Sequence, residues 1–369
     1  MKTIFVGGAR PNFMKIAPIL EEVRKISGMR PILVHTGQHY DRELSGVFFE
    51  QLGLPEPDRY LGVGSGSHAR QTARIMIEFE KILLEDRPGL VVVVGDVNST
   101  LACSITSVKL HVPLAHVEAG LRSFDRTMPE EVNRVVTDSL SELLFTTCED
   151  AEANLIREGI PRERIHFVGN VMIDSLRQHV EVARKSDVLT RLSLAEGDYA
   201  VLTLHRPSNV DTAGTLLGIV TAMGEIQRHV PVVFPVHPRT RKALASGAVK
   251  EKLKEMERFI LLEPLGYIDF LRLLMSSRLV LTDSGGIQEE TTVLGIPCLT
   301  LRENTERPVT VTDGTNTIVG TDSQRIVREA VAILDGKGKA GRIPPLWDGQ
   351  ASRRIAAVLE DWLSTRTGP

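Results

Sequence analysis

Short apolar runs alternate with longer segments of helical periodicity along most of the chain. In the first half the runs are "TIFVGG" (3–8), "RPILVHTG" (30–37), "LVVVVGD" (90–96), "VPLAHVEAG" (112–120) and "RIHFVGN" (164–170). Because these runs are almost continuously apolar, they fit parallel strands that helices cover on both faces. The alternation therefore predicts an α/β fold.

The pattern restarts in the second half of the chain. Further strands are predicted at "YAVLTLHR" (199–206), "PVVFPVH" (231–237), "RFILLEP" (258–264), "RLVLTD" (278–283) and "IPCLTLR" (296–302). We expect two doubly wound, Rossmann-like domains facing a cleft, an N-terminal one over 1–171 and a C-terminal one over 172–352. "NRVVTDSLSELLF" (133–145) is predicted as one helix, and a last helix within 353–369 is expected to pack back on the first domain.

Composition argues against several classes of function. Hydrophobic residues make up 42% and charged residues 25% of the 369 residues, and the formal net charge is −3, so nothing favours binding to nucleic acid or to an anionic membrane. No apolar run reaches the ~20 residues that span a bilayer, and the first strand begins at Thr3, so we expect no signal peptide. The three cysteines are far apart and show no disulfide or zinc spacing, which indicates the reducing cytoplasm.

Polar residues follow the predicted strands of the first domain, at the edge where doubly wound sheets bind ligands. "GGARPNFMK" (7–15) puts Arg10 and Lys15 around a helix start, where the helix dipole and two cations attract an anion. Asp96 and Glu118 follow two later strands, and "MPEEVNR" (128–134) puts Glu130 beside a second acid at a helix start. Solvated charges, helix caps and first-turn acids remain the structural alternatives for each residue taken alone.

The second domain offers two histidines and a glycine-rich helix start. His205 and His237 end two strands, and histidine suits proton transfer or contact with a diphosphate. "LTDSGGIQEE" (281–290) ends a strand and then places backbone N–H groups where they can bind phosphate, at Ser284, Gly285 and Gly286.

Glu290 lies about one turn inside that helix, where its carboxylate can accept hydrogen bonds from ribose hydroxyls. Together these features predict a nucleoside diphosphate derivative as ligand. The alternative is a structural turn followed by acids at a helix start.

Neither a metal nor a redox cofactor is predicted. His35 and His39 straddle a strand end and a glycine turn, and no carboxylate completes a ligand set with them. The dinucleotide fingerprint G-x-G-x-x-G is absent from the first strand–helix turn, which argues against NAD. An acyl-transfer role for Ser284 is disfavoured because G-x-S-x-G is missing.

The motifs, taken in order, resemble those of the non-hydrolysing UDP-N-acetylglucosamine 2-epimerase family. They run from residue 7 to about residue 317 and are "GGARPNFMKIAP", "HTGQHYD", "GDVNSTLA", "HVEAGLRS", "PEEVNR", "GNVMID", "LTLHRPSN", "FPVHPR", "TDSGGIQEE" and "ERPVTVTDGTN". The resemblance implies a glycosyltransferase-B-like fold, a homodimer without cofactor, and reversible conversion of UDP-GlcNAc to UDP-ManNAc for surface polysaccharide synthesis.

The resemblance also assigns residues. It implies catalytic roles for Asp96, Glu118, Glu130 and His205. It implies binding of the UDP-sugar by Arg10, Lys15, Arg134, His237, Leu265, Phe270, Ser284, Gly285, Gly286, Glu290 and Arg307, with Leu265 and Phe270 at the uracil. The stretch "QHYD" departs from the family's allosteric "QHR", although Gln38, Arg70 and His237 could still contribute to an allosteric site.

The chemistry implied is elimination of UDP to a 2-acetamidoglucal, followed by re-addition. Inversion at C2 needs proton-handling groups on two faces, and clustered carboxylates can divide these roles. Four alternatives stay open: an epimerase of a UDP-diacetamido sugar or uronic acid, a hydrolysing epimerase, a glycosyltransferase of similar fold, and a nucleotide-sugar sensor.

Overall fold

The computed structural model describes residues 1–38, 56–245 and 247–367, so His39, Tyr40 and Asp41 of "QHYD" lie outside the described residues. The chain divides into two compact units. Met1–Arg177 with Pro345–Pro369 forms unit 1, and Gln178–Pro344 forms unit 2. The boundaries expected from the sequence were 171 and 352.

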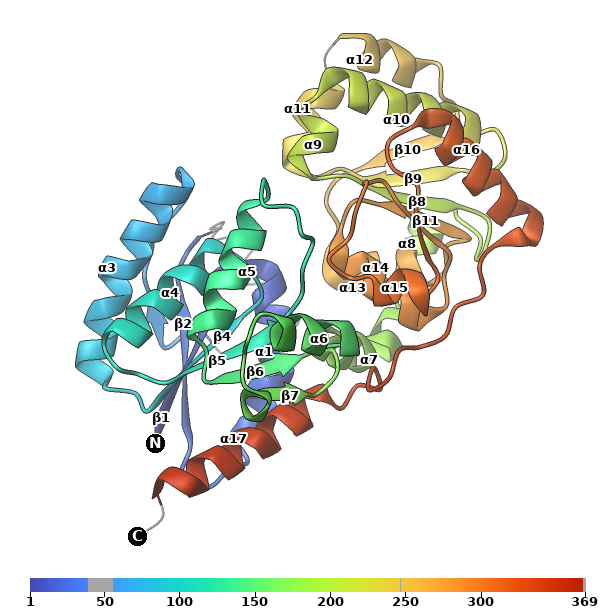
Figure 1. Cartoon of the computed structure of the whole chain (residues 1–369). Coiled ribbons are helices and arrows are strands. Elements are labelled where there is room, and N and C mark those ends of the chain that lie inside the picture. The colour runs from blue at the N-terminus through green and yellow to red at the C-terminus, as the bar shows by residue number, and fades with distance from the viewer. Residues whose placement is uncertain (39–55, 246, 368–369) are drawn as a thin grey trace. The chain divides into compact units, whose positions relative to one another are not determined.

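Unit 1 is built on a seven-stranded parallel sheet with the order β3-β2-β1-β4-β5-β6-β7. The strands are β1 (Lys2–Gly7), β2 (Arg30–His35), β3 (Arg59–Tyr60), β4 (Leu90–Val94), β5 (Leu114–Ala119), β6 (Leu143–Thr146) and β7 (Ile165–Phe167). Figure 1 shows helices on both faces, with α3, α4 and α5 grouped together and α1 beside α17. Since the strand order runs outward from the β1–β4 pair, the doubly wound sheet has its switch point there.

The helices of unit 1 complete the βα alternation. They are α1 (Arg10–Val23), α3 (His68–Asp86), α4 (Asn98–Lys109), α5 (Pro129–Leu140), α6 (Glu149–Arg157), α7 (Val171–Ala183), which runs on into unit 2, and α17 (Ala351–Thr367).

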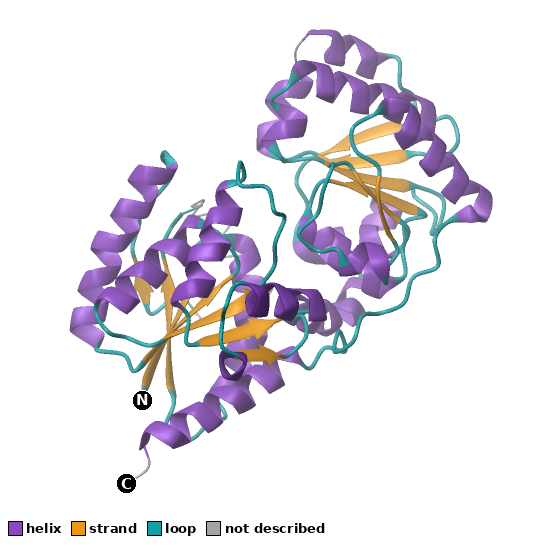
Figure 2. Cartoon of the chain, viewed as in Figure 1, coloured by secondary structure: helices purple, strands orange, loops and turns teal. Residues whose placement is uncertain are grey.

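Unit 2 repeats the plan, with helices around an inner sheet (Figure 2). The sheet has six parallel strands in the order β10-β9-β8-β11-β12-β13, and its switch point lies between β8 and β11. The strands are β8 (Ala200–Thr203), β9 (Val232–Pro235), β10 (Phe259–Leu262), β11 (Leu279–Thr282), β12 (Cys298–Thr300) and β13 (Asn316–Ile318). The helices are α8 (Val188–Arg191), α9 (Pro207–Val210), α10 (Ala213–Ile226), α11 (Pro238–Leu244), α12 (Gly247–Lys254), α13 (Tyr267–Met275), α14 (Gly285–Leu294), α15 (Val309–Thr312) and α16 (Ser323–Ala332).

Strand β4 explains why the apolar runs are continuous. Every residue of Leu90–Val94 is fully buried, so both faces of this strand are covered. Val91 and Val93 pack in one cluster with Ile75 and Phe79 of α3. The expected α/β fold of two doubly wound units is confirmed in each unit.

The prediction of one helix over 133–145 is wrong in its last third. Helix α5 ends at Leu140, Ser141 has extended backbone dihedrals, and Leu143–Thr146 forms β6 between β5 and β7. A short apolar run such as "ELLF" suits a helix or a buried strand equally well. The strand forms because its four residues fill a buried position inside the sheet.

The C-terminal helix belongs to unit 1. Helix α17 packs against α1, and the Asp174 carboxylate accepts hydrogen bonds from the backbone N–H groups of Ala351 and Ser352 at its start, at 3.2 and 2.7 Å. Trp347, which is buried, donates its indole N–H to the Thr147 carbonyl oxygen at 2.9 Å.

Candidate functional site

The turn after β1 is fixed by its own side chains. The Asn12 side-chain oxygen accepts hydrogen bonds from the N–H groups of Gly8 and Ala9, at 3.2 and 2.9 Å, and its amide donates to the Val94 carbonyl oxygen at 2.8 Å. A Cβ at Gly8 would lie 2.1 Å from Ser99 Oγ, so only glycine fits between this turn and α4. The hydrogen bonds of Asn12 thus hold the start of α1 against the end of β4. Arg10, at the first position of α1, is exposed.

Lys15 and Glu118 form a buried ion pair. Their residues are only 7% and 4% exposed. Glu118 has a φ of 73°, which is rare for a residue with a side chain, and it lies at a shift of register between β5 and β6. Such strain persists where the surroundings enforce it, and it gathers at functional sites. Gly95 makes room, because a Cβ there would lie 3.3 Å from Glu118 Oε2.

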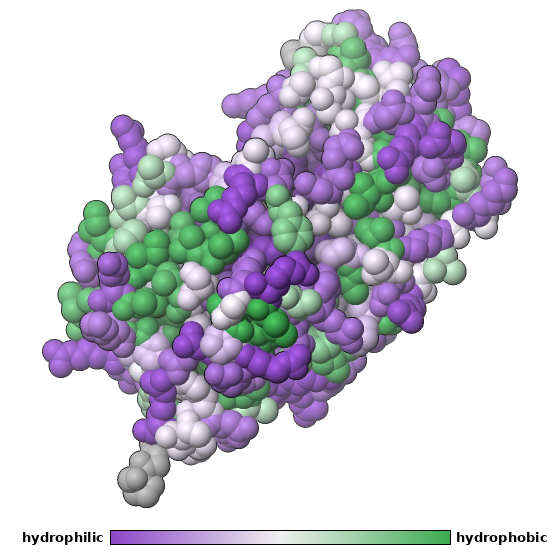
Figure 3. All heavy atoms as spheres, viewed as in Figure 1, coloured by the Kyte–Doolittle hydropathy of each residue, from purple (hydrophilic) through white to green (hydrophobic). Residues whose placement is uncertain are grey.

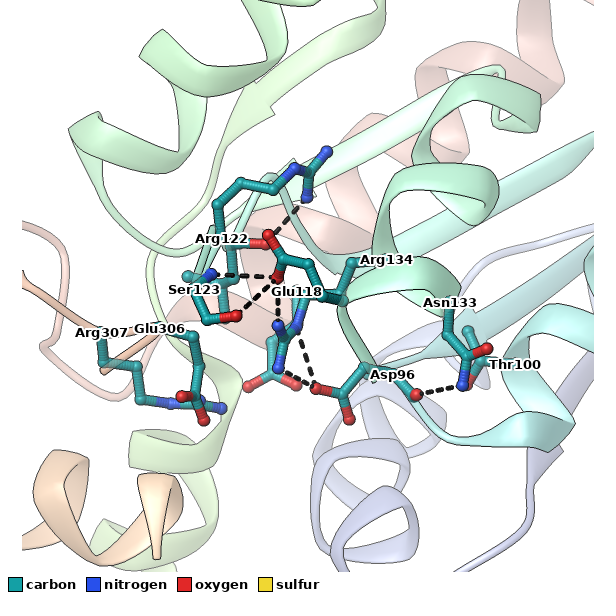
Figure 4. A network of polar contacts seen from close by, with 12 residues as sticks. Asp96, Thr100, Glu118, Arg122, Ser123, Asn133, Arg134, Glu306 and Arg307 are labelled. Carbon is teal, nitrogen blue, oxygen red and sulfur yellow. Dashed lines mark hydrogen bonds and ion pairs between the residues drawn. The ribbon is translucent and has the colours of Figure 1, made fainter. Parts of the chain in front are cut away.

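Asp96 is held by Arg134. The guanidinium donates to Asp96 Oδ2 from Nε at 3.0 Å and Nη2 at 2.7 Å (Figure 4). Its Nη1 donates to Glu131 at 2.6 Å, and Glu131 also accepts from the backbone N–H groups of Ser123 and Phe124. The Asp96 side chain keeps 30% of its surface exposed, so it stays accessible while its charge is balanced.

The two neighbouring acids of "MPEEVNR" differ in their surroundings. Glu131 is buried and holds the loop before α5. Glu130 is half-buried and makes no hydrogen bond or ion pair with any residue that the structure describes. The sequence could not separate the two; burial assigns the structural role to Glu131 and leaves the Glu130 carboxylate available.

A buried histidine braces the elements that carry these acids. His116 Nδ1 lies 2.6 Å from Asp138 Oδ1, and His116 Nε2 lies 2.9 Å from the Gly95 carbonyl oxygen. Asp138 also pairs with Arg122 at 2.7 Å; although burial opposes it, the charges of His116 and Arg122 lower the pKa of Asp138. Through these two contacts the ring links β4, β5 and α5. Only its place inside an apolar strand marked this residue in the sequence.

In unit 2, His205 follows β8 and pairs with Asp283, which follows β11. His205 Nδ1 lies 2.8 Å from Asp283 Oδ1, and the same carboxylate accepts from the backbone N–H of Arg206 at 3.0 Å. His237 caps α11 after β9, and its ring centre lies 6.2 Å from that of His205. The two predicted histidines therefore lie together at the same sheet edge.

Ser284 is the N-cap residue of α14, and the helix starts at Gly285. A Cβ at Gly285 would lie 2.7 Å from both Arg307 Nη1 and Glu306 Oε1, so this glycine lets a charged cluster reach the helix start. Arg307 pairs with Glu289 at 2.6 Å and with Glu306 at 2.8 Å. Three guanidiniums surround the Glu306 carboxylate, from Arg206, Arg302 and Arg307. Because two carboxylates face these three cations, the cluster favours an anion at the start of α14.

Sequence reasoning named only Arg307 of this cluster. It gave no role to Glu289, Arg302 or Glu306. The signal was present in "LRENTER", where charges directly follow a buried strand.

Glu290 lies in the second turn of α14 and is 3% exposed. The Tyr267 hydroxyl donates to Glu290 Oε1 at 3.0 Å, which orients the carboxylate. Leu265 and Phe270 are half-buried and pack against one apolar cluster of unit 2, together with Ile287 of α14. The predicted ribose and uracil residues are thus grouped around α13 and α14.

The residues considered for allostery fall in both units. Gln38 is buried and accepts from Ser99 N–H at 2.9 Å, and Gln71 donates to the Gln38 carbonyl oxygen at 3.2 Å. Arg70 belongs to unit 1 with Gln38, whereas His237 belongs to unit 2. An open pocket of about 460 Å³ lies at the start of α3, lined by Val63, Ser65, Gly66, Ser67, Arg70, Gln71 and Arg74.

Among residues 1–38, 56–245 and 247–367, no group of three or more His, Cys, Asp or Glu side chains could hold a metal ion. No helix in this described part of the chain is long and apolar enough to cross a membrane. Burial lowers the pKa of His35 to about 4, and its Nδ1 accepts from the Gly37 N–H at 2.8 Å, so this ring is a neutral part of the turn after β2.

Comparison with known proteins identifies the family. The sequence model of the UDP-N-acetylglucosamine 2-epimerase family matches residues 21–360. A UDP-N-acetylglucosamine 2-epimerase of Methanocaldococcus jannaschii is 42% identical over 97% of this chain and 99% of its own length. A UDP-2,3-diacetamido-2,3-dideoxy-D-glucuronate 2-epimerase of Pseudomonas aeruginosa is also 42% identical, over 97% of this chain and 99% of its own.

A solved structure shows the same likeness in three dimensions. The crystal structure of the Methanocaldococcus jannaschii UDP-GlcNAc 2-epimerase in complex with UDP-GlcNAc and UDP has a TM-score of 0.90 to this chain. It is 42% identical, and the match covers 97% of this chain and 99% of that one. The match extends over both units. The chain belongs to the UDP-N-acetylglucosamine 2-epimerase family.

Proposed function

We propose that this protein interconverts UDP-GlcNAc and UDP-ManNAc by eliminating UDP and adding it back. The observation that carries the proposal is the set of carboxylates at the carboxyl edge of the unit 1 sheet. Asp96 and Glu118 each have a cation partner, while Glu130 in the first turn of α5 has none among the described residues. Groups in such different environments can divide the two proton transfers of an inversion.

The reaction needs no oxidant or reductant. One carboxylate takes the proton from C2 while the C1–O bond to UDP breaks. The C2–H electron pair becomes the C1=C2 double bond of a 2-acetamidoglucal, and the C1–O pair leaves with UDP. UDP then adds to C1 as a second group delivers a proton to the opposite face of C2.

The leaving diphosphate needs positive charge. In unit 2 the start of α14 presents the N–H groups of Gly285 and Gly286 beside the arginine cluster. We assign the diphosphate to this helix start, with His205 as its hydrogen-bond donor, Arg307 as part of its positive surroundings, Glu290 at the ribose, and Leu265 and Phe270 at the uracil. His237 lies beside His205 and serves the same substrate.

In unit 1 Arg10 is exposed at the start of α1, where its cation is accessible to the substrate. Lys15 acts through Glu118, because its ammonium is buried in that ion pair. Arg134 acts in the same way through Asp96.

A single experiment tests the reaction. UDP-GlcNAc incubated with the enzyme in D2O should gain deuterium at C2 as it epimerises, and NMR measures this gain. Asp96→Asn, Glu118→Gln and Glu130→Gln should each lower the rate about 10²–10⁴-fold if they handle the proton. Glu149→Gln is the matched control for Glu130, because Glu149 is a first-turn acid of α6. Epimerisation without deuterium at C2 would exclude elimination.

A second substrate is favoured by one finding. The Pseudomonas aeruginosa relative that acts on a diacetamido glucuronate nucleotide is as similar, at 42%, as the Methanocaldococcus jannaschii one. Comparing kcat/KM for UDP-GlcNAc and for the diacetamido uronate decides between them. A hydrolysing epimerase would instead release free ManNAc, and a glycosyltransferase would need an acceptor.

We further propose a homodimer through the faces of α3, α4 and α5. Figure 3 shows hydrophobic side chains gathered over this part of unit 1. Ile77 and Leu84 of α3 are 56% and 59% exposed, and Val132 of α5 is 41% exposed. An apolar face of this kind marks a protein interface.

The three cysteines are buried and free, which agrees with work in the cytoplasm.

The pocket at the start of α3 is a candidate second site for the substrate, with Arg70 at its rim. Arg70→Ala should then change the dependence of rate on UDP-GlcNAc concentration without abolishing turnover.

A further inference from the structure

Two histidines lie side by side at the carboxyl edge of the unit 2 sheet, and their hydrogen bonds differ in kind. His205 follows β8 and His237 follows β9, with ring centres 6.2 Å apart. The His205 side chain is 43% exposed, so its second ring nitrogen can face a ligand. Whether Nδ1 of each ring carries a proton can be worked out from its partner.

His205 must carry a proton on Nδ1. Its partner at 2.8 Å is Asp283 Oδ1, and the Asp283 side chain is fully buried. That carboxylate also accepts from the backbone N–H of Arg206 and from the Asn209 amide, at 3.0 and 3.2 Å. A carboxylate surrounded by donors stays ionised and accepts, so the proton between the two lies on the histidine.

His237 must lack a proton on Nδ1. Its Nδ1 accepts the backbone N–H of Arg239 at 3.2 Å, as the N-cap of α11. A ring that accepts through one nitrogen is neutral. His237 therefore adds no charge beside His205.

The other charged groups near His205 are already paired. Arg206, next in the chain, pairs with Glu306 at 3.3 Å. Arg239, beyond His237, pairs with Asp211 at 2.5 Å. Asp283 is thus the carboxylate that balances a proton on His205.

We propose that Asp283 is a positioning residue that holds His205 as an imidazolium with Nε2–H directed at the leaving diphosphate. The proposal rests on the proposed function and adds a residue to it. As the C1–O bond breaks, its electron pair and negative charge pass to the UDP oxygen. The His205 Nε2–H then donates a hydrogen bond to the diphosphate, and on re-addition the same contact weakens as the C1–O bond forms. His205 is therefore a donor in this reaction, and the carboxylates of unit 1 are the groups that take the C2 proton.

The first test is Asp283→Asn, with UDP-GlcNAc as substrate. Removing the negative charge disfavours the imidazolium, so the alkaline limb of the kcat profile should move down by about one pH unit or more. Since the charge matters most as UDP leaves, kcat should fall more than KM rises. Asp174→Asn is the matched control: Asp174 is also buried and accepts two backbone N–H groups, but no histidine, and its pH profile should not move.

The second test needs no variant of Asp283. Long-range ¹H–¹⁵N spectra of the wild-type enzyme, labelled at histidine and assigned with His205→Gln and His237→Gln, report the proton on each ring nitrogen. At a pH below the alkaline limb we expect both ring nitrogens of His205 to be protonated and Nδ1 of His237 to be unprotonated. An unprotonated Nδ1 or Nε2 on His205 there, or a folded Asp283→Asn enzyme with an unmoved alkaline limb, overturns the proposal. If the wild-type enzyme does not epimerise UDP-GlcNAc, the proposed function fails instead, and the spectra still decide the protonation of the pair.

Discussion

The Lys15–Glu118 pair allows a quantitative prediction, because both side chains are almost completely removed from water. Their side chains are 9% and 3% exposed. Removing one partner of a buried pair leaves the other charge uncompensated, which costs about 3–5 kcal/mol. Lys15→Met removes the charge and keeps an unbranched chain, so the variant should lose this amount of stability. For a domain of this size that corresponds to a fall in Tm of about 6–20 °C.

The chain supplies its own probe for the measurement. Its two tryptophans, Trp347 and Trp362, both belong to unit 1. Tryptophan fluorescence during heating therefore follows the unit that holds the ion pair. Lys25→Met is the control, because Lys25 follows the same helix and pairs with Glu22 through a side chain that is 59% exposed. An exposed pair of this kind contributes about 0–1 kcal/mol.

The double variant completes the test. Lys15→Met combined with Glu118→Gln leaves no buried charge at this position, so it should be at least as stable as either single variant. The rate losses of the two single variants should likewise not add, since both act through one carboxylate. A Lys15→Met protein that unfolds within 2 °C of the wild type would show that the pair is not desolvated, and the reasoning would fail.

Three further predictions concern other parts of the molecule. Glu290→Ala should weaken UDP binding by about 1–3 kcal/mol through loss of a charged acceptor, and unchanged calorimetric binding would remove the ribose role. Burial alone would raise the pKa of Asp138, but His116 and Arg122 together outweigh it, so the pKa is lowered in the folded state. Its carboxylate therefore contributes stability above the unfolded pKa of about 3.9, and this stability is lost as pH falls from there through the lower pKa of the folded state. Asp138→Asn should be less stable than the wild type at pH 7. In urea titrations its free energy of unfolding should fall less steeply at acid pH. Ile77→Asp should convert the proposed dimer to monomer in light scattering, whereas a dimer unchanged in mass would place the interface elsewhere.

Much of the fold could be predicted because one pattern was enough. The continuous valine runs of β4 could only be satisfied by a sheet covered on both faces, and the structure buries all of them. Strands β3, β6 and β13 were not predicted. β3 has only two residues, the apolar run of β6 continues the helical pattern of α5, and β13 reads "NTI", with a single apolar residue. Position at strand ends also located the candidate residues, since that edge is common to all parallel strands.

The sequence could not predict which charged side chains pair with each other, because the pairing depends on distances between strand ends. Nothing in the sequence says that Lys15 meets Glu118, 103 residues away. Nor does it say that Asp283, read only as the end of a strand, orients His205. Glu130 and Glu131 are adjacent and chemically identical, and only burial separates them.

The path of the chain has a consequence for synthesis. Unit 2 is one continuous segment, whereas unit 1 takes its last helix from residues that are made after unit 2 is complete. During synthesis unit 1 thus lacks α17 and the buried Trp347 until the last part of the chain is made. Until then the side of α1 that α17 covers stays exposed to solvent. Unit 1, whose synthesis starts first, is therefore completed last. A stop codon just after residue 344 would therefore leave the whole sequence of unit 2 intact and damage the unit at the opposite end of the gene.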